Sequence, residues 1–169
     1  SVPGVITDNP FLRLRANEAR YVPLVTDRLV LAGRVDVGAG WPLGEAVDLT
    51  PNRRFFAGGV STMRGYRRRE LGPRDVEGKP IGGEAQVLAG LELRQQLIGI
   101  FGAAAFVDAG QVWRESDAIA LGSLEYAAGG GLMITTPIGP IRLDAAYNLT
   151  EPPPGEPRFL LQLGIGHPY

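Results

Sequence analysis

The chain has 169 residues, of which 44% are hydrophobic, and its formal net charge is −1. This length and apolar content suit one folded unit and exclude an intrinsically disordered chain. The near-neutral charge and the pI of about 5.9 lack the basic excess of nucleic-acid-binding proteins, so no nucleic-acid partner is expected. The absence of cysteine excludes a disulfide framework and thiolate metal sites.

Glycine and proline are frequent, with 24 Gly and 14 Pro, and they interrupt almost every window long enough for a helix. Polar and apolar residues instead alternate at period two, which predicts β-strands. Seven strands are expected over residues 11–24, 29–41, 83–94, 99–113, 124–136, 141–149 and 158–169, with a tight turn at residues 137–140. No apolar run approaches the roughly 18 residues of a membrane-spanning helix, so a chain that crosses a membrane would use strands.

Charged residues recur on one face of several predicted strands. Three pairs spaced two positions apart each share a face: Arg34 with Asp36, Glu92 with Arg94, and Arg142 with Asp144. The opposite faces are apolar, and the strands of about ten residues are joined by alternating short turns and long loops. This pattern is typical of a membrane β-barrel with a polar lumen, but a soluble β-sandwich would bury the same apolar faces.

A segment of about forty residues, 42–81, separates the second and third predicted strands. It is too long for an ordinary connection in a compact domain, which indicates a functional loop. Gly58 and Gly59 lie in it, followed by Arg64-Gly65-Tyr66 and a run of three arginines at residues 67–69. We interpret the arginine run as a solvated loop face rather than a lipid-binding patch.

Residues 55–73 closely resemble the long inward-folded loop of the BamA/TamA family, the bacterial surface antigen superfamily, whose Arg-Gly-Phe/Tyr signature matches Arg64-Gly65-Tyr66. Further motifs follow in the family's order: Gly82-Gly83, Leu91-Glu92-Leu93, Phe106-Val107-Asp108-Ala109-Gly110 and the stretch 137–144. Each motif is weak alone, but the series at these spacings is specific. The resemblance covers residues 11–169.

The resemblance implies an all-β fold, namely the carboxy-terminal portion of a sixteen-stranded antiparallel transmembrane β-barrel in the bacterial outer membrane. The seven strands would belong to one domain over residues 1–169, with the loop at residues 42–81 folded into the lumen. The implied partners are outer-membrane lipid, client outer-membrane or secreted proteins, and the upstream strands and POTRA domains of the same protein, which this chain does not contain.

Arg64 is the residue on which the expected site depends. A guanidinium inside a confined polar lumen needs anionic partners, because its donors would otherwise be unsatisfied. Glu92 and Asp108 lie on the polar faces of neighbouring predicted strands, so one guanidinium can bridge them, and the family pattern implies the same pairing. The alternative from the residues alone is an exposed loop cation with Asp108 facing solvent.

Four neighbouring residues support this predicted lock of the loop. Gly65 allows a tight turn beside Arg64, and Tyr66 is expected to pack its ring while its hydroxyl finds a hydrogen-bond partner. Phe106 belongs to the same motif as Asp108, and Gly110 is expected to make room for the loop.

The last residues resemble the carboxy-terminal β-signal by which barrels are recognised for insertion. Gln162, Gly164, His167 and Tyr169 carry this resemblance, although the ending departs from the aromatic-x-aromatic pattern. Glycines in the last strand also favour poor pairing with the first strand, and therefore a weak lateral seam that client strands could enter.

The implied function is assembly or insertion of outer-membrane proteins. The alternatives are a two-partner secretion pore, the barrel attached to a patatin-like lipase, or a soluble β-sandwich binding module. No enzyme activity is expected, because His167 is the only histidine and Ser61 lacks the second glycine of a nucleophile elbow. No metal or cofactor is expected, since no His-rich or Asp-rich spacing occurs.

Overall fold

The computed structural model describes residues 10–44, 48–137 and 139–166. Its strands are β1 (Phe11–Pro23), β2 (Leu29–Pro42), β3 (Ala85–Gln96), β4 (Phe101–Trp113), β5 (Glu125–Thr136), β6 (Gly139–Asn148) and β7 (Phe159–Ile165), with one short 3-10 turn, η1 (Leu121–Ser123), before β5. The predicted all-β antiparallel fold is confirmed, and every predicted strand overlaps an observed one. No helix among the described residues has the length and apolar character needed to cross a membrane.

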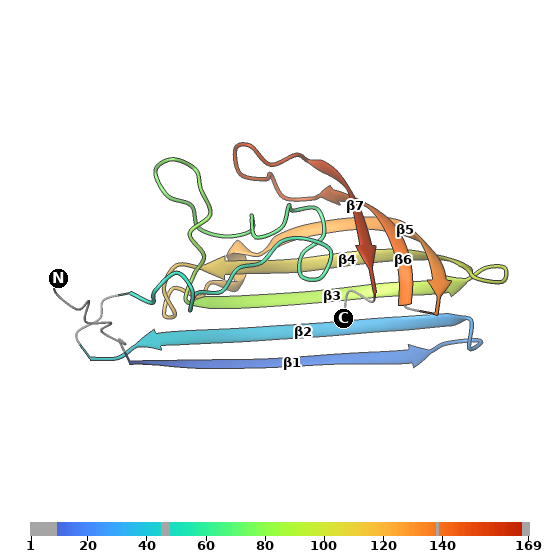
Figure 1. The fold of residues 1–169 in the computed structure, drawn as a ribbon, viewed down its shortest axis with the longest axis horizontal. Helices are drawn as coiled ribbons and strands as arrows, with labels where there is room; N and C mark the ends of the chain where they lie inside the picture. Colours follow the sequence, from blue (N-terminus) through green and yellow to red (C-terminus); the bar gives the residue numbers. More distant parts are fainter. Residues whose placement is uncertain (1–9, 45–47, 138, 167–169) are drawn as a thin grey trace, which may run out of the picture.

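The seven strands form one antiparallel sheet in the order of the chain. Figure 1 shows that the sheet curves strongly, so that β5, β6 and β7 turn over the region above β3 and β4. Among the described residues β1 pairs only with β2 and β7 only with β6, so the sheet is open at both edges. The described strands form one curved layer, so the alternative of a two-layer β-sandwich does not describe this structure.

Every strand differs at one or both ends, by one to four residues, from the range that the sequence predicts. β4 begins at Phe101 because Gly99, with φ +56°, turns the chain between β3 and β4. β6 begins at Gly139, which pairs with Thr136, so the connection after β5 is shorter than the predicted four-residue turn. β7 ends at Ile165, and residues 167–169 lie outside the described residues.

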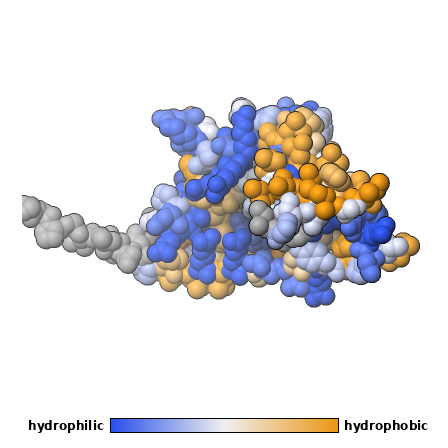
Figure 2. Space-filling model, turned by 45° about the vertical axis from the view of Figure 1, so that its right-hand side comes forward, coloured by the Kyte–Doolittle hydropathy of each residue, from blue (hydrophilic) through white to orange (hydrophobic). Residues whose placement is uncertain are grey.

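The two faces of the sheet differ sharply in chemistry. The face toward the long loop, here called the concave face, carries buried charged residues: Arg34, Asp36, Glu92, Arg94, Asp108, Arg142 and Asp144. The opposite, convex face carries exposed apolar residues: Leu14, Val35, Leu91, Val107, Leu143 and Leu163. Figure 2 shows hydrophobic side chains gathered over the last strands of the sheet. The period-two pattern therefore separates the faces as predicted.

The long loop lies on the concave face over its residues 48–84 and provides much of the hydrophobic core. Five of its buried residues, namely Phe55, Ala57, Met63, Tyr66 and Leu71, form one apolar cluster with Leu88, Val112 and Ala127 of the sheet. An isolated bridge joins Phe55, inside the loop, to Gly83 at the end of the loop. The core thus lies between the loop and the sheet rather than between two sheets.

The convex face generates a first prediction. If it contacts lipid, Leu143→Arg should lower the free energy of unfolding from a bilayer by about 2–4 kcal/mol, because Leu143 lies in the middle of β6. Leu97→Arg is the matched control, since Leu97 is 50% exposed against 48% for Leu143 but lies in a turn, where the expected cost is about 0–1 kcal/mol. Equal costs at both positions would contradict lipid contact.

Candidate functional site

The tip of the long loop is shaped by two glycines that precede Arg64. Gly58 and Gly59 have φ values of +111° and +99°, a region that side chains rarely adopt. The Gly58 N–H donates to the Thr62 hydroxyl at 2.8 Å, and the Gly59 N–H donates to the carbonyl oxygens of Met63 at 3.1 Å and Tyr66 at 3.0 Å. These bonds close a compact tip that presents Arg64 to the sheet.

Arg64 points from this tip onto β3 and β4. Its Nε and Nη2 atoms donate to the two carboxylate oxygens of Asp108, each at 2.7 Å, and its backbone N–H donates to the same carboxylate at 3.1 Å. Its Nη1 atom donates to Glu92. All three side chains are fully buried, so the exposed-cation alternative does not describe this structure. The structure brings the three residues of the predicted lock together.

Glu92 is the centre of a larger set of charges. Its carboxylate accepts from Arg64, from Arg94 Nε at 2.5 Å, and from both Nη atoms of Arg142 at 3.0 Å. Four donors match the capacity of two carboxylate oxygens. Arg142 also donates to Asp144 through two bonds of 2.9 Å. We call Arg64, Arg94, Arg142, Glu92, Asp108 and Asp144 the charge cluster; its three positive and three negative groups balance.

Arg64 also stacks on an aromatic ring. Its guanidinium carbon lies 3.6 Å from the centroid of the Phe106 ring, which gives the predicted motif residue a direct contact. Burial alone would lower the pKa of Arg64, but the hydrogen bonds and negative charges of Asp108 and Glu92 raise this pKa above its ordinary value. The cluster therefore holds Arg64 charged.

Gly65 and Tyr66 fix the loop tip against β5 and β6. Gly65 has φ +94°, and an added Cβ atom would collide with the side-chain oxygen of Asn148. The Asn148 side-chain amide donates to the Gly65 carbonyl oxygen at 2.9 Å. The Tyr66 hydroxyl donates to Glu125 at 3.2 Å, and burial, together with the charge of Glu125, raises the pKa of Tyr66 above its ordinary value. Tyr66 thus packs and hydrogen-bonds within the same buried site.

Three of the other predicted residues, Gly110, Gln162 and Gly164, lie on the concave face, and two lie outside the described residues. Gly110 lies on the concave face opposite Leu88, where an added Cβ would meet Leu88 Cδ2 at 2.6 Å, and Leu88 itself packs with the loop residues of the core. Gln162 and Gly164 face the concave side of β7, close to the loop tip. His167 and Tyr169 lie outside the described residues. The sequence did not predict that Arg142 binds Glu92 or that Asn148 binds the loop tip, although both residues lie on the polar face of β6.

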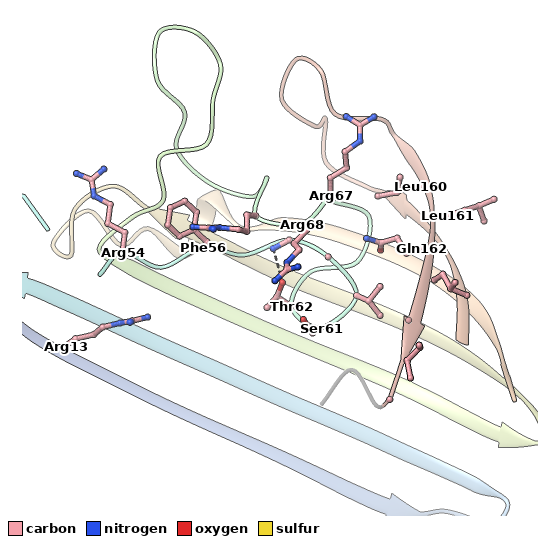
Figure 3. A pocket seen from close by; sticks show the side chains of 18 residues that line it. Arg13, Arg54, Phe56, Ser61, Thr62, Arg67, Arg68, Leu160, Leu161 and Gln162 are labelled. Carbon is pink, nitrogen blue, oxygen red and sulfur yellow. Dashed lines mark hydrogen bonds between the residues drawn. The ribbon is translucent and has the colours of Figure 1, made fainter. Parts of the chain in front are cut away.

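A cavity of about 890 Å³ lies between the loop tip and β7 (Figure 3). Five arginines contribute to its lining, namely Arg13, Arg54, Arg67, Arg68 and Arg69, and none of the described lining residues is acidic. The run at residues 67–69 is therefore only partly a solvated face, because Arg69 stacks on the Phe56 ring at 3.9 Å and Arg67 contacts Glu156 at 3.4 Å. No group of three or more acidic or histidine side chains is arranged to hold a metal in the described part of the chain.

The whole sequence matches one known protein family. The model of the Omp85 superfamily domain matches residues 1–169. The chain belongs to the Omp85 superfamily. This membership confirms the resemblance that the ordered motifs carry, and it agrees with an open sheet that has an apolar convex face.

Named relatives within the superfamily are proteins called outer membrane protein assembly factor BamA. The one from Neisseria meningitidis serogroup B is 30% identical over 183 residues, which cover 88% of this chain and 23% of that protein. The one from Nitratidesulfovibrio vulgaris is 29% identical over 169 residues, covering 93% of this chain and 20% of that protein. This Omp85 chain therefore spans less than a quarter of the length of these relatives.

A solved structure shares the fold. The crystal structure of BamA from Haemophilus ducreyi lacking POTRA domains 1–3 matches with a TM-score of 0.75 and 23% sequence identity. The match covers 96% of this chain and 36% of that chain. The curved seven-stranded sheet is thus a portion of a BamA-like barrel fold.

The charge cluster generates a second prediction, for Arg64→Ala in this Omp85 protein. The change removes the two-bond guanidinium partner of buried Asp108 and one of the four donors to Glu92, so the loop should be destabilised by about 3–5 kcal/mol. Hydrogen exchange of the loop amides measures this loss as faster exchange. Arg68→Ala is the matched control, because Arg68 is exposed in the same loop and should change stability by less than about 0.5 kcal/mol.

Arg64→Lys separates charge from geometry. A lysine keeps the positive charge but cannot form the planar two-bond contact with Asp108, so its loop should exchange at a rate between those of the parent protein and Arg64→Ala. A lysine variant that exchanges like the parent would show that charge alone holds the loop.

Proposed function

We propose that this chain is the carboxy-terminal portion of the barrel of an outer-membrane protein assembly or insertion factor of the BamA/TamA type. The observation that carries the proposal is the 30% identity, over 88% of the chain, to a protein named for outer-membrane protein assembly. The protein is integral to the bacterial outer membrane, and its convex face contacts lipid. Upstream strands and POTRA domains of the same protein complete the barrel and receive its clients.

The last strand provides the route for clients. β7 has seven residues, fewer than any other strand, and in the complete barrel it meets the first strand at a seam. A short partner strand that contains Gly164 pairs weakly, because glycine contributes no side-chain packing and costs backbone entropy. A client strand enters the seam by adding to the exposed edge through backbone hydrogen bonds. The process changes strand pairing and needs no bond chemistry, catalytic residue or cofactor.

The long loop is folded into the lumen and held there by Arg64, Gly65, Tyr66, Glu92 and Asp108. Support for this lock comes from the buried contacts of Arg64 with both carboxylates. Phe106, Gly58 and Gly59 shape its surroundings, whereas Gln162, Gly164, His167 and Tyr169 carry the signal for the chain's own insertion. A fixed loop keeps the lumen wall rigid on the side of β3 and β4 while the seam opens.

The function is tested with the full-length protein in lipid vesicles that receive an unfolded outer-membrane protein as client. We expect faster client folding than in empty vesicles, and a several-fold loss of this acceleration with Arg64→Ala. Arg68→Ala should keep the parent rate. Vesicles that release a secreted partner but accelerate no barrel client would instead favour the two-partner secretion pore, and hydrolysis of lipid would favour the patatin-like fusion.

The seam has its own test. Cysteines placed in the first and last strands of the full-length barrel should form a disulfide that closes the seam. Client folding should then fall on oxidation and return on reduction. Client folding that persists in the fully crosslinked protein would refute entry through the seam.

A further inference from the structure

The closing hairpin, formed by β6 and β7, holds the backbone of the loop tip directly. Gln162 on β7 points toward the loop, whereas Leu161 points to the opposite side (Figure 3). The Gln162 side-chain oxygen accepts from the Gly65 N–H at 3.2 Å, and its Nε2 atom donates to the Tyr66 carbonyl oxygen at 3.0 Å. Both ends of one amide group are therefore used on two consecutive residues of the tip.

Asn148 on β6 extends this contact. Its Nδ2 atom donates to the Gly65 carbonyl oxygen at 2.9 Å and to the Pro157 carbonyl oxygen at 3.2 Å. Three backbone groups of the tip, the N–H and carbonyl of Gly65 and the carbonyl of Tyr66, thus bind side-chain amides of the closing hairpin. These contacts are independent of the charge cluster, because no ionised group takes part in them.

A steric contact lies next to the amide contacts. Gly164 follows Gln162 by two positions on the same face of β7, and an added Cβ at Gly164 would lie 2.8 Å from Val60 Cγ1. Val60 therefore fills the notch that this glycine leaves in the strand. The contact of Val60 with Gly164 and the hydrogen bonds of Gln162 together fix the position of β7 relative to the loop, both along the strand and across it.

We propose that Gln162 is a positioning residue of the seam, which holds the closing strand on the loop tip so that the free edge of β7 is presented at a fixed place. The loop is itself anchored on β3 and β4 through Arg64, so it acts as a strut between the barrel wall and the closing strand. This inference rests on the proposed function for the role of the seam, but the attachment of β7 to the loop can be tested without any client.

The test uses Val60→Cys with Gly164→Cys in the full-length protein in outer membranes. Val60 Cβ lies 3.6 Å from the Cβ position at residue 164, which suits a disulfide. Replacing Val60 by Cys also removes the Cγ1 atom that would collide. Mild oxidation should therefore link the loop to β7. Failure of this pair to crosslink in the correctly folded protein would overturn the proposal.

Gln162→Leu is then added to the cysteine pair. Loss of both amide contacts should slow the crosslink several-fold, while heat-modifiable migration shows that the barrel still folds. Gln96→Leu is the matched control, because the Gln96 amide donates to the Gly99 carbonyl within its own turn, at 3.0 Å, far from β7, and its removal should leave the crosslinking rate unchanged. An unchanged rate with Gln162→Leu would contradict the positioning role.

Two further measurements keep the test decisive. Gln162→Glu keeps the oxygen that accepts from Gly65 but loses the donor, so its crosslinking rate should be intermediate, and it replaces Gln162→Leu if that variant does not fold. In the client assay, Gln162→Leu should lower the rate of client folding, and complete oxidation of the cysteine pair should restore it. If Gln162→Leu slows crosslinking but oxidation of the cysteine pair does not restore client folding, the seam role is overturned. If the parent protein accelerates no client folding at all, the proposed function fails, but the crosslinking result still tests the attachment of β7 to the loop.

Discussion

The buried contact of Arg64 with Glu92 and Asp108 is the interaction on which the rest of the structure depends. Removing three fully buried charges from water is costly, and the cost is offset only because the partners are close and every Glu92 lone pair accepts a donor. The cluster is neutral as a set, so no single member can be lost without leaving a charge uncompensated. This constraint holds a loop of about forty residues in one place on the sheet.

The loop in turn links parts of the sheet that are not neighbours. Arg64 binds β3 and β4, Tyr66 reaches Glu125 of β5, and Gln162 and Asn148 hold the tip from β7 and β6. Most of these contacts converge on three consecutive residues. A single turn of chain can therefore connect five strands because the sheet curves around it, which an open flat sheet would not allow.

Local sequence patterns predicted the strands and their faces because side-chain direction alternates strictly along a strand. The pairing of Arg64 was predictable for the same reason, since Glu92 and Asp108 both lie on the polar face of their strands. Gln162 was interpreted only as part of an insertion signal, because nothing near it in the sequence shows that curvature carries β7 over the loop. The pairing of Gly110 with Leu88, which packs with the loop, was not predictable, because it depends on strand register, which the sequence pattern leaves open.

The sequence separation of the tip contacts has a consequence for how the chain folds. Neighbouring strands follow one another along the chain and can pair by hairpins, but Arg64 must wait for Asp108, which lies 44 positions later, and Gly65 for Gln162, which lies 97 positions later. Closing loops of this length is entropically slow compared with forming a hairpin. The contact of Gly65 with Gln162 can form only once β7 is in place, so a docked tip reports that the sheet has been built as far as β7.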